Sequence, residues 1–291
     1  MMRVTRLTLV ALLLTAGCGQ SVTGTPVADP DGTRKAGEKA YSVAVQALNA
    51  YLQKTTDLRG SIYYYAAVNE RKSGSDVDIA MRGTPAAFYY KSRSKTPPGY
   101  DYDTYHPASD PLEYVKLGQA YSSIAPTPWV SMPATEPGFT CAIAGLQTLC
   151  KINGALDATD KAKPPGRSTT ATTAADGSTE VRTEITLKAF VDNSVINIPA
   201  DVVGLIEPGL MNKLVPVKIV VNSDGTLHRA EVKGELQGSK TKVQIELGYE
   251  SRGPADASDF PSVPQPGELT ALPDKAAKDD FWDRMAKIRN N

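Results

Sequence analysis

The chain has 291 residues, 22% of them charged and 41% hydrophobic, and its 32 basic and 32 acidic residues give a formal net charge of zero. The basic residues are scattered along the sequence, which argues against a nucleic-acid-binding surface, because such a surface needs clustered positive charge. Two histidines and three cysteines leave few residues for metal or nucleophilic chemistry.

Residues 1–17 have the organisation of a secretory signal peptide, in which two arginines precede a short apolar run, Leu7 to Leu14, and small residues follow. The run is shorter than the roughly 20 residues that span a bilayer. The next motif, "LTAGC", resembles the lipobox of bacterial lipoproteins, with Thr15 where leucine is usual. The resemblance implies cleavage before Cys18 and its modification by acyl chains such as palmitate. The alternative is a soluble secreted product.

Residues 18–33 are mostly glycine, proline, serine, threonine and aspartate, which predicts a flexible tether with a reach of roughly 20 Å. Residues 34–291 are then available for one folded domain. We therefore expect a domain on the extracytoplasmic side of the cell membrane, attached to the lipid bilayer through Cys18.

Arg34 to Lys54 has apolar residues at helical spacing and predicts an amphipathic helix. After Gly60 the period changes to two, and three alternating runs separated by turn signals predict consecutive antiparallel strands near residues 62–68, 77–82 and 87–90.

The middle of the chain is less regular. Tyr100 to Asp110 is acidic and aromatic and predicts an irregular segment, whereas Tyr114 to Ile124 predicts a strand. The proline-rich stretch around Trp129 predicts a rigid turn, and Asp160 to Ser178 predicts a long exposed loop.

With Cys18 acylated, Cys141 and Cys150 remain as a pair in an oxidising compartment, which predicts a disulfide. Nine helical steps would separate their Cα atoms by roughly 13 Å, whereas a disulfide needs less than about 7 Å. The chain must therefore reverse between them, and Gly145 is the expected position. The alternative is two buried free thiols.

The second half of the chain carries the clearest alternation, which predicts strands over Val181–Val191, Val215–Val221 and Thr241–Tyr249 with one dry and one wet face. Pro199 to Leu214 predicts a short, bent helix because glycine and proline interrupt it, and it is either an irregular core helix or a gate over an apolar opening. Pro273 to Asn290 predicts a terminal amphipathic helix.

Val215 to Leu272 contains two strands about an Asp-Gly turn, a third strand ending at Tyr249, and "SDFPSVPQPGEL". In this order of elements, together with the lipobox and the first helix, the chain resembles the LppX/LprAFG-type actinobacterial lipoproteins, which are similar to LolA and LolB. The resemblance implies a single α+β domain, in which a strongly curved antiparallel sheet, a half-barrel, has helices packed on its concave face. It also implies binding of lipid or glycolipid acyl chains and a part in their transport across the cell envelope. The cysteine pair and the loop at residues 164–177 have no counterpart that we can identify in that family.

If the half-barrel is hollow, its lining comes from the dry faces of the strands and from the interrupted helix. The candidates are Ile185, Leu187, Val217, Ile219, Val243, Ile245, Leu247, Leu205, Ile206 and Met211. An empty cavity costs about 24 cal/mol per Å³, so a hollow of this kind must be occupied or functional. The sequence itself fits a filled core equally well.

Nothing in the sequence predicts catalysis, a cofactor or a metal site. The two histidines lack ligand spacing, and Asp101, Asp103 and Asp110 do not match a calcium-binding loop. Tyr100, Tyr102 and Tyr105 suggest a surface for sugar headgroups or for an envelope protein partner. The alternative function is thus a structural or interaction lipoprotein with a filled core and a tyrosine-rich binding surface.

Overall fold

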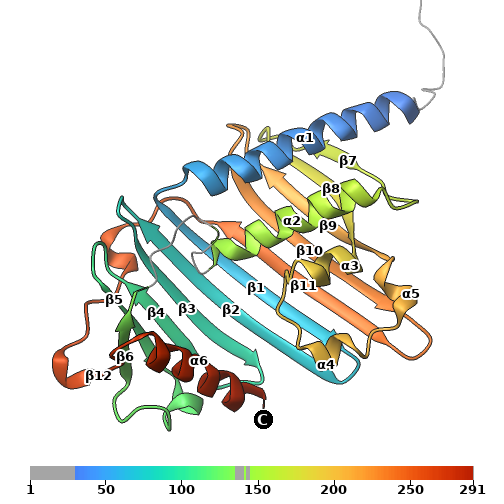
Figure 1. Ribbon diagram of the computed structural model, residues 1–291. Coiled ribbons are helices and arrows are strands. Elements are labelled where there is room, and N and C mark those ends of the chain that lie inside the picture. Colours follow the sequence, from blue (N-terminus) through green and yellow to red (C-terminus); the bar gives the residue numbers. More distant parts are fainter. Residues whose placement is uncertain (1–29, 135–140, 142–144, 291) are drawn as a thin grey trace, which may run out of the picture.

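The computed structural model describes residues 30–134, 141 and 145–290. The signal peptide, the lipobox and Cys18 lie outside this part of the chain. In the described part, twelve strands form one sheet in the order β12-β6-β5-β4-β3-β2-β1-β11-β10-β9-β8-β7 (Figure 1). All neighbouring strands are antiparallel except β12 and β6, which run parallel.

The strands divide into two groups that meet at the β1–β11 pair. The first group is β1 (Leu58–Val68), β2 (Arg71–Arg82), β3 (Ala87–Thr96), β4 (Tyr102–His106), β5 (Leu112–Leu117) and β6 (Trp129–Pro133). The second is β7 (Thr170–Thr173), β8 (Thr179–Thr186), β9 (Leu214–Val221), β10 (Leu227–Gln237), β11 (Lys242–Ser251) and β12 (Leu269–Ala271), of which β12 alone lies at the far edge beside β6. The central pair places Ile62 opposite Tyr249, so the two halves of the sequence share one sheet.

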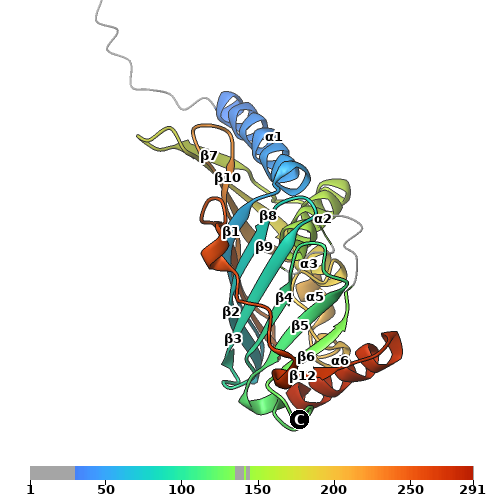
Figure 2. The same ribbon diagram turned by 90° about the vertical axis from the view of Figure 1, so that its left-hand side faces the viewer.

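All six α-helices of the described residues lie on one face of the sheet, the concave face (Figures 1 and 2). They are α1 (Pro30–Lys54), α2 (Leu146–Ala162), α3 (Leu187–Asp192), α4 (Ala200–Val203), α5 (Pro208–Met211) and α6 (Lys275–Asn290). Short 3-10 turns occupy Gln119–Tyr121, Ala257–Asp259 and Pro266–Glu268. The architecture is the curved, open, mainly antiparallel sheet with helices on its concave face that the sequence predicted.

Strand alternation explains why the helices share a face. Along β9, Val215, Val217, Ile219 and Val221 are 0–4% exposed, while the residues between them are more accessible. Because successive side chains point to opposite faces of a strand, one face becomes apolar and needs a cover. Helices α1 to α5 provide it over the β1–β2 and β8–β11 strands, and they bury the larger apolar cluster with them.

A second, smaller apolar cluster lies beneath α6. It consists of Val115, Tyr121, Ile124, Val130, Met132, Phe281 and Met285. Phe281 and Met285 are one helical turn apart, which places them on the same side of α6 and against β5 and β6. The concave face therefore has two separately covered apolar regions.

The predicted disulfide is present. The Cα atoms of Cys141 and Cys150 are 5.8 Å apart. Gly145 has a φ of 92°, a left-handed conformation that favours glycine, and it immediately precedes α2. The predicted chain reversal at this glycine is confirmed.

Several sequence-based boundaries are wrong. The segment predicted as irregular contains β4, an inner strand, because its acidic residue Asp103 is neutralised by Arg93 on β3. The turn predicted around Trp129 is strand β6, and the strand predicted over Tyr114–Ile124 starts at Leu112 and ends at Leu117. The first helix begins at Pro30, one turn before Arg34, and proline is well tolerated in a first turn.

The prediction for the region between Cys150 and Val191 also needs correction. Helix α2 extends into the predicted loop as far as Ala162, and the same loop contains the exposed edge strand β7. The strand predicted over Val181–Val191 ends at Thr186, whose side chain caps α3 by accepting a hydrogen bond from the Ala189 amide.

We expect Gly37→Ala to destabilise the fold. Alanine normally stabilises a helix interior by about 1 kcal/mol relative to glycine. In α1, however, a Cβ at Gly37 would lie 2.4 Å from the carbonyl oxygen of Thr169, and such overpacking costs about 1–3 kcal/mol. Urea unfolding measures the change, and Gly209→Ala, where no atom lies within 4 Å, is the control. Equal stability of Gly37→Ala and the unmodified protein would contradict close docking of α1.

Candidate functional site

The residues predicted to line a cavity lie together on the concave face, with two exceptions. Those that are 0–1% exposed are Ile185, Leu187, Val217, Ile219, Val243, Ile245 and Leu247, and Ile206 is 6% exposed. Leu187 reaches this cluster from α3, although a strand was predicted for it. Met211 packs at its margin, whereas the side chain of Leu205 is 49% exposed and does not line it.

These side chains form a filled core in this conformation. At 0–1% exposure, a water-sized sphere touches almost none of their surface, either from outside or from an internal void. Protein interiors packed in this way leave no space for a hydrocarbon chain between the side chains. A ligand that enters the apolar region must therefore displace part of its cover.

The cover is not uniform. Helices α1 and α2 have 25 and 17 residues, whereas α3 has six and α4 and α5 have four each. Val202, Ile206 and Leu210 from the α4–α5 segment are buried against the main cluster. Because single helical turns have little stability of their own, this segment depends on its contacts with the sheet. The bent, interrupted shape predicted for Pro199–Leu214 is confirmed.

One carboxylate fastens the α4–α5 segment to the turn between β10 and β11. Glu207, immediately before α5, accepts hydrogen bonds from the backbone amides of Ser239 at 3.2 Å and Thr241 at 2.8 Å, from the Lys240 amide, and from the Ser239 hydroxyl at 2.9 Å. The Thr241 hydroxyl donates to the Leu205 carbonyl oxygen at 2.8 Å. The amide of Lys240 and the hydroxyl of Ser239 lower the pKa of Glu207 from 4.5 to about 2.

Three polar side chains, Arg289, Tyr64 and Ser73, connect the helix over the smaller apolar cluster with the strands of the larger one, and we call them the polar strip. Arg289, from the last turn of α6, donates through Nη2 to the Tyr64 hydroxyl at 2.9 Å and to the Ser73 hydroxyl at 3.2 Å. Tyr64 packs against the larger cluster, and Tyr102 packs against the smaller one. Burial raises the pKa of Tyr121 to about 12, while the nearby charge of Arg289 lowers it.

Within the described residues, Arg289 forms no ion pair with a carboxylate. A guanidinium group has five N–H donors and always carries its charge, so the two hydrogen bonds to hydroxyls leave both donors and charge available. Removing such a group from water without an opposite charge is unfavourable. The polar strip is therefore suited to an anionic group beside an apolar surface.

Sequence reasoning missed both charged residues of this face. Arg289 follows Phe281 and Met285 at intervals of four, so the apolar stripe of the terminal helix itself placed an arginine toward the sheet. Glu207 had no comparable signal, because its partners are backbone amides 32 to 34 residues away in the sequence.

The tyrosine surface predicted near residue 100 is not formed as one surface. Tyr102 lies on the concave face, with its ring centroid 6.2 Å from that of Trp282 in α6. Tyr105 is three residues further along the same strand and lies on the opposite face, near Phe260. The three aspartates of this segment bind neighbouring protein groups, and the described residues contain no cluster of potential metal ligands.

None of the helices in the described part of the chain is both long enough and apolar enough to span a membrane.

No protein-family model and no curated protein matches the chain. Among solved structures, it is similar to the lipoprotein LppX of Mycobacterium tuberculosis, with 14% identity and a TM-score of 0.32 over 75% of this chain and 93% of that chain. It is also similar to a DUF1329 family protein from Desulfovibrio piger, with 10% identity and a TM-score of 0.23 over 75% and 91% of the two chains. A LolA superfamily protein from Nitrosomonas europaea has 9% identity and a TM-score of 0.22 over 77% and 94%.

LppX and a LolA superfamily protein are thus among the similar structures, as the resemblance in the sequence predicted. No ligand or activity of those proteins is transferred to this chain.

We expect the attachment of the α4–α5 segment to weaken in acid. The folded pKa of Glu207 lies below its unfolded value, so the carboxylate bonds are fully present above about pH 4.5 and are lost as the pH falls toward about 2. Hydrogen-exchange protection of the Ser239, Lys240 and Thr241 amides should fall over this range. Glu207→Gln should lower that protection at neutral pH as well.

Asp224→Asn is the matched control, because Asp224 is a turn carboxylate whose bonds remain within the β9–β10 hairpin, at Thr226. Protection at Ser239 to Thr241 that is independent of pH over this range, or equally reduced by Asp224→Asn, would contradict the role of Glu207.

Proposed function

We propose that this protein is a lipid-anchored, extracytoplasmic binding protein that holds an amphiphilic lipid or glycolipid on the concave face of its sheet and takes part in its transport or presentation across the cell envelope. It acts without catalysis, and its anchor is an acylated Cys18. The acyl chain occupies the apolar region beneath the α4–α5 segment, and the polar end of the lipid lies at Arg289.

The observation that carries this proposal is the position of Arg289. The arginine bonds Tyr64, which packs against the larger apolar cluster, and lies in the helix that covers the smaller one. Amphiphilic ligands need an apolar surface and a polar group at one end of it, and small-molecule sites combine these features. Among the residues that the structure describes, no carboxylate pairs with Arg289, and a purely structural core has little use for such an unpaired charge.

To bind an acyl chain, the protein must replace the buried side chains of the α4–α5 segment with the chain itself. Displacing Val202, Ile206 and Leu210 exposes three buried side chains, at about 1.5–3 kcal/mol each. About ten methylene groups of an acyl chain, at about 0.8 kcal/mol each, offset that cost. The segment that must move is the least regular part of the cover, and the three buried side chains and the hydrogen bonds of Glu207 hold it.

The filled core supports a second candidate function, a structural or interaction lipoprotein that holds a protein partner. Seven of the predicted lining residues are no more than 1% exposed, so the domain is complete without a ligand. In this version the α4–α5 segment stays closed, and recognition occurs elsewhere on the surface.

Native mass spectrometry of the Cys18→Ser protein, purified from its own envelope, distinguishes the two candidates. The binding proposal expects bound lipid that survives purification and is released by organic solvent. Repeated recovery of a stable protein without lipid, which also takes up none from vesicles, would contradict the binding proposal and favour the interaction lipoprotein.

We further expect Arg289→Gln to reduce uptake of an anionic lipid selectively. Loss of a charge-assisted hydrogen bond weakens binding by about tenfold or more. The measurement is lipid captured from vesicles of phosphatidylglycerol and phosphatidylcholine, with Lys287→Gln, an exposed charge in the same helical turn, as the control. An equal loss with both lipids, or the same effect from Lys287→Gln, would contradict a headgroup role for Arg289.

A further inference from the structure

A groove lies on the convex face of the sheet, away from the helices. Its volume is about 450 Å³, and its floor is formed by β1, β2 and β3 through residues that include Gly60, Ala80, Tyr89 and Lys91. Its wall is the segment that follows β11, residues 252–261, which crosses this outer face (Figure 2). The volume is within the range of about 300–1,000 Å³ that is typical of small-molecule sites.

The wall of this convex groove is held in place by its own carboxylate. Asp259 accepts a hydrogen bond from the Asp256 amide at 2.9 Å, which closes a capping box at the 3-10 turn. The same carboxylate pairs with Arg59 on β1 at 3.5 Å. The groove is therefore pre-formed, because the wall is fixed both to itself and to the floor.

The charges that line the groove do not cancel. Its two carboxylates each pair with an arginine, Asp259 with Arg59 and Asp78 with Arg252 at 3.1 Å. The third cation, Lys91, is half-buried on β3 and makes no ion pair with any residue that the structure describes. The lining thus carries one positive charge in excess.

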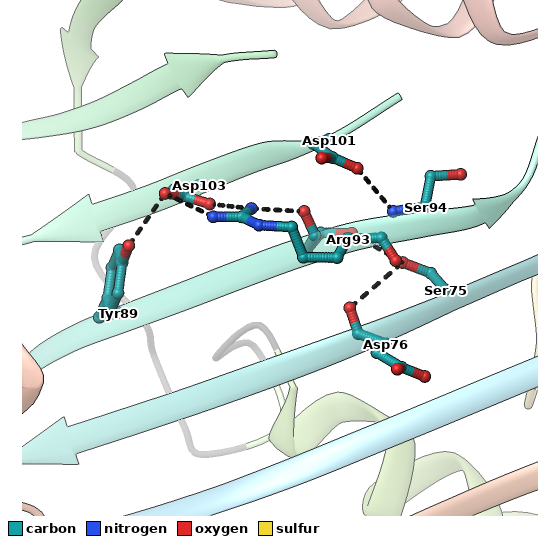
Figure 3. Close-up of polar contacts among 8 residues, drawn as sticks. Ser75, Asp76, Tyr89, Arg93, Ser94, Asp101 and Asp103 are labelled. Carbon is teal, nitrogen blue, oxygen red and sulfur yellow. Dashed lines mark hydrogen bonds and ion pairs between the residues drawn. The ribbon is translucent and has the colours of Figure 1, made fainter. Parts of the chain in front are cut away.

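Two aspartates lie directly opposite Lys91 in the strand register, and one of them, Asp78 on β2, is paired with Arg252. Asp103 on β4 lies directly opposite Lys91, and opposite charges at such positions usually pair across strands. Asp103 is instead bonded to the guanidinium of Arg93 and to the Tyr89 hydroxyl at 2.9 Å (Figure 3). Its side chain is 7% exposed, so these two neighbours enclose it and leave the Lys91 ammonium to the groove.

Aromatic rings supply the remaining surface. Tyr89 lines the floor and Phe260 the wall, and both rings contact Tyr105, with centroid distances of 6.3 and 6.4 Å. Aromatic faces beside hydrogen-bonding and charged groups suit a ligand that has both an apolar face and polar substituents. A sugar ring has this character.

We propose that the convex groove is a second binding site, and that it takes an acidic saccharide whose carboxylate or phosphate group is bound by the ammonium of Lys91. The sugar ring packs against Tyr89 and Phe260, and the Arg59–Asp259 and Arg252–Asp78 pairs border it. This site is independent of the concave face, since it lies on the other side of the sheet and is formed by different residues.

Isothermal titration calorimetry and NMR titration test the site with glucuronate and glucose 6-phosphate as probes, against glucose and inorganic phosphate. We expect both acidic sugars to bind in the millimolar range or more tightly, and glucose and phosphate to bind at least about tenfold more weakly, because each lacks one of the two recognised features. Absence of binding by both acidic sugars, or equal binding of inorganic phosphate, would overturn the proposal.

Variants locate the binding. Lys91→Met should weaken binding of the acidic sugars by about tenfold or more, whereas Lys91→Arg should retain it. Lys72→Met is the matched control, because Lys72 is exposed on the same face of the neighbouring strand β2 but outside the groove. Thermal unfolding checks that each variant is folded. Unchanged affinity in Lys91→Met, or an equal loss in Lys72→Met, would overturn the assignment to this groove.

Discussion

The fold depends on the need to cover one apolar face of an open sheet. Strand alternation makes the concave face of β1, β2 and β8–β11 almost wholly apolar, and every α-helix that the structure describes lies on that side. The cover is strong where α1 and α2 lie and weak where α3, α4 and α5 supply only one or two turns each. We therefore expect the α4–α5 segment to be the part of the cover that moves most easily.

Charged groups mark the borders of the covered regions. Glu207 holds the weak segment to the β10–β11 turn, and Arg289 lies where the two apolar clusters approach each other. On the opposite face, Arg93 encloses Asp103 and thereby leaves Lys91 to the convex groove. The availability of Lys91 follows from the pairing of both aspartates beside it, Asp103 with Arg93 and Asp78 with Arg252. The two faces of one sheet consequently carry two chemically different candidate sites.

The sequence allowed prediction of what depends on local periodicity. The alternation in the second half of the chain, the helical stripe of the terminal helix, and the reversal at Gly145 between the cysteines all agree with the structure. What depends on distant partners was not predictable: β4 looks irregular until Arg93 neutralises Asp103, and Leu205 shares an apolar segment with Ile206 but faces solvent. Helix α2 was not predicted, although Leu149, Ile152 and Leu156 have helical spacing. Whether the apolar face was filled could not be read from the sequence, since hollow and packed cores use the same residue types.

We propose that the α4–α5 segment moves away from an otherwise fixed sheet when lipid binds. Double electron–electron resonance measures this movement directly as the distance between two spin labels. One label is at Leu205→Cys in the segment and the other at Lys233→Cys, which is exposed on β10. The protein carries Cys18→Ser and keeps its disulfide intact. The account predicts a narrow distance distribution without lipid and an additional, longer distance once lipid is bound. An identical, narrow distribution in the lipid-bound and lipid-free protein would contradict it.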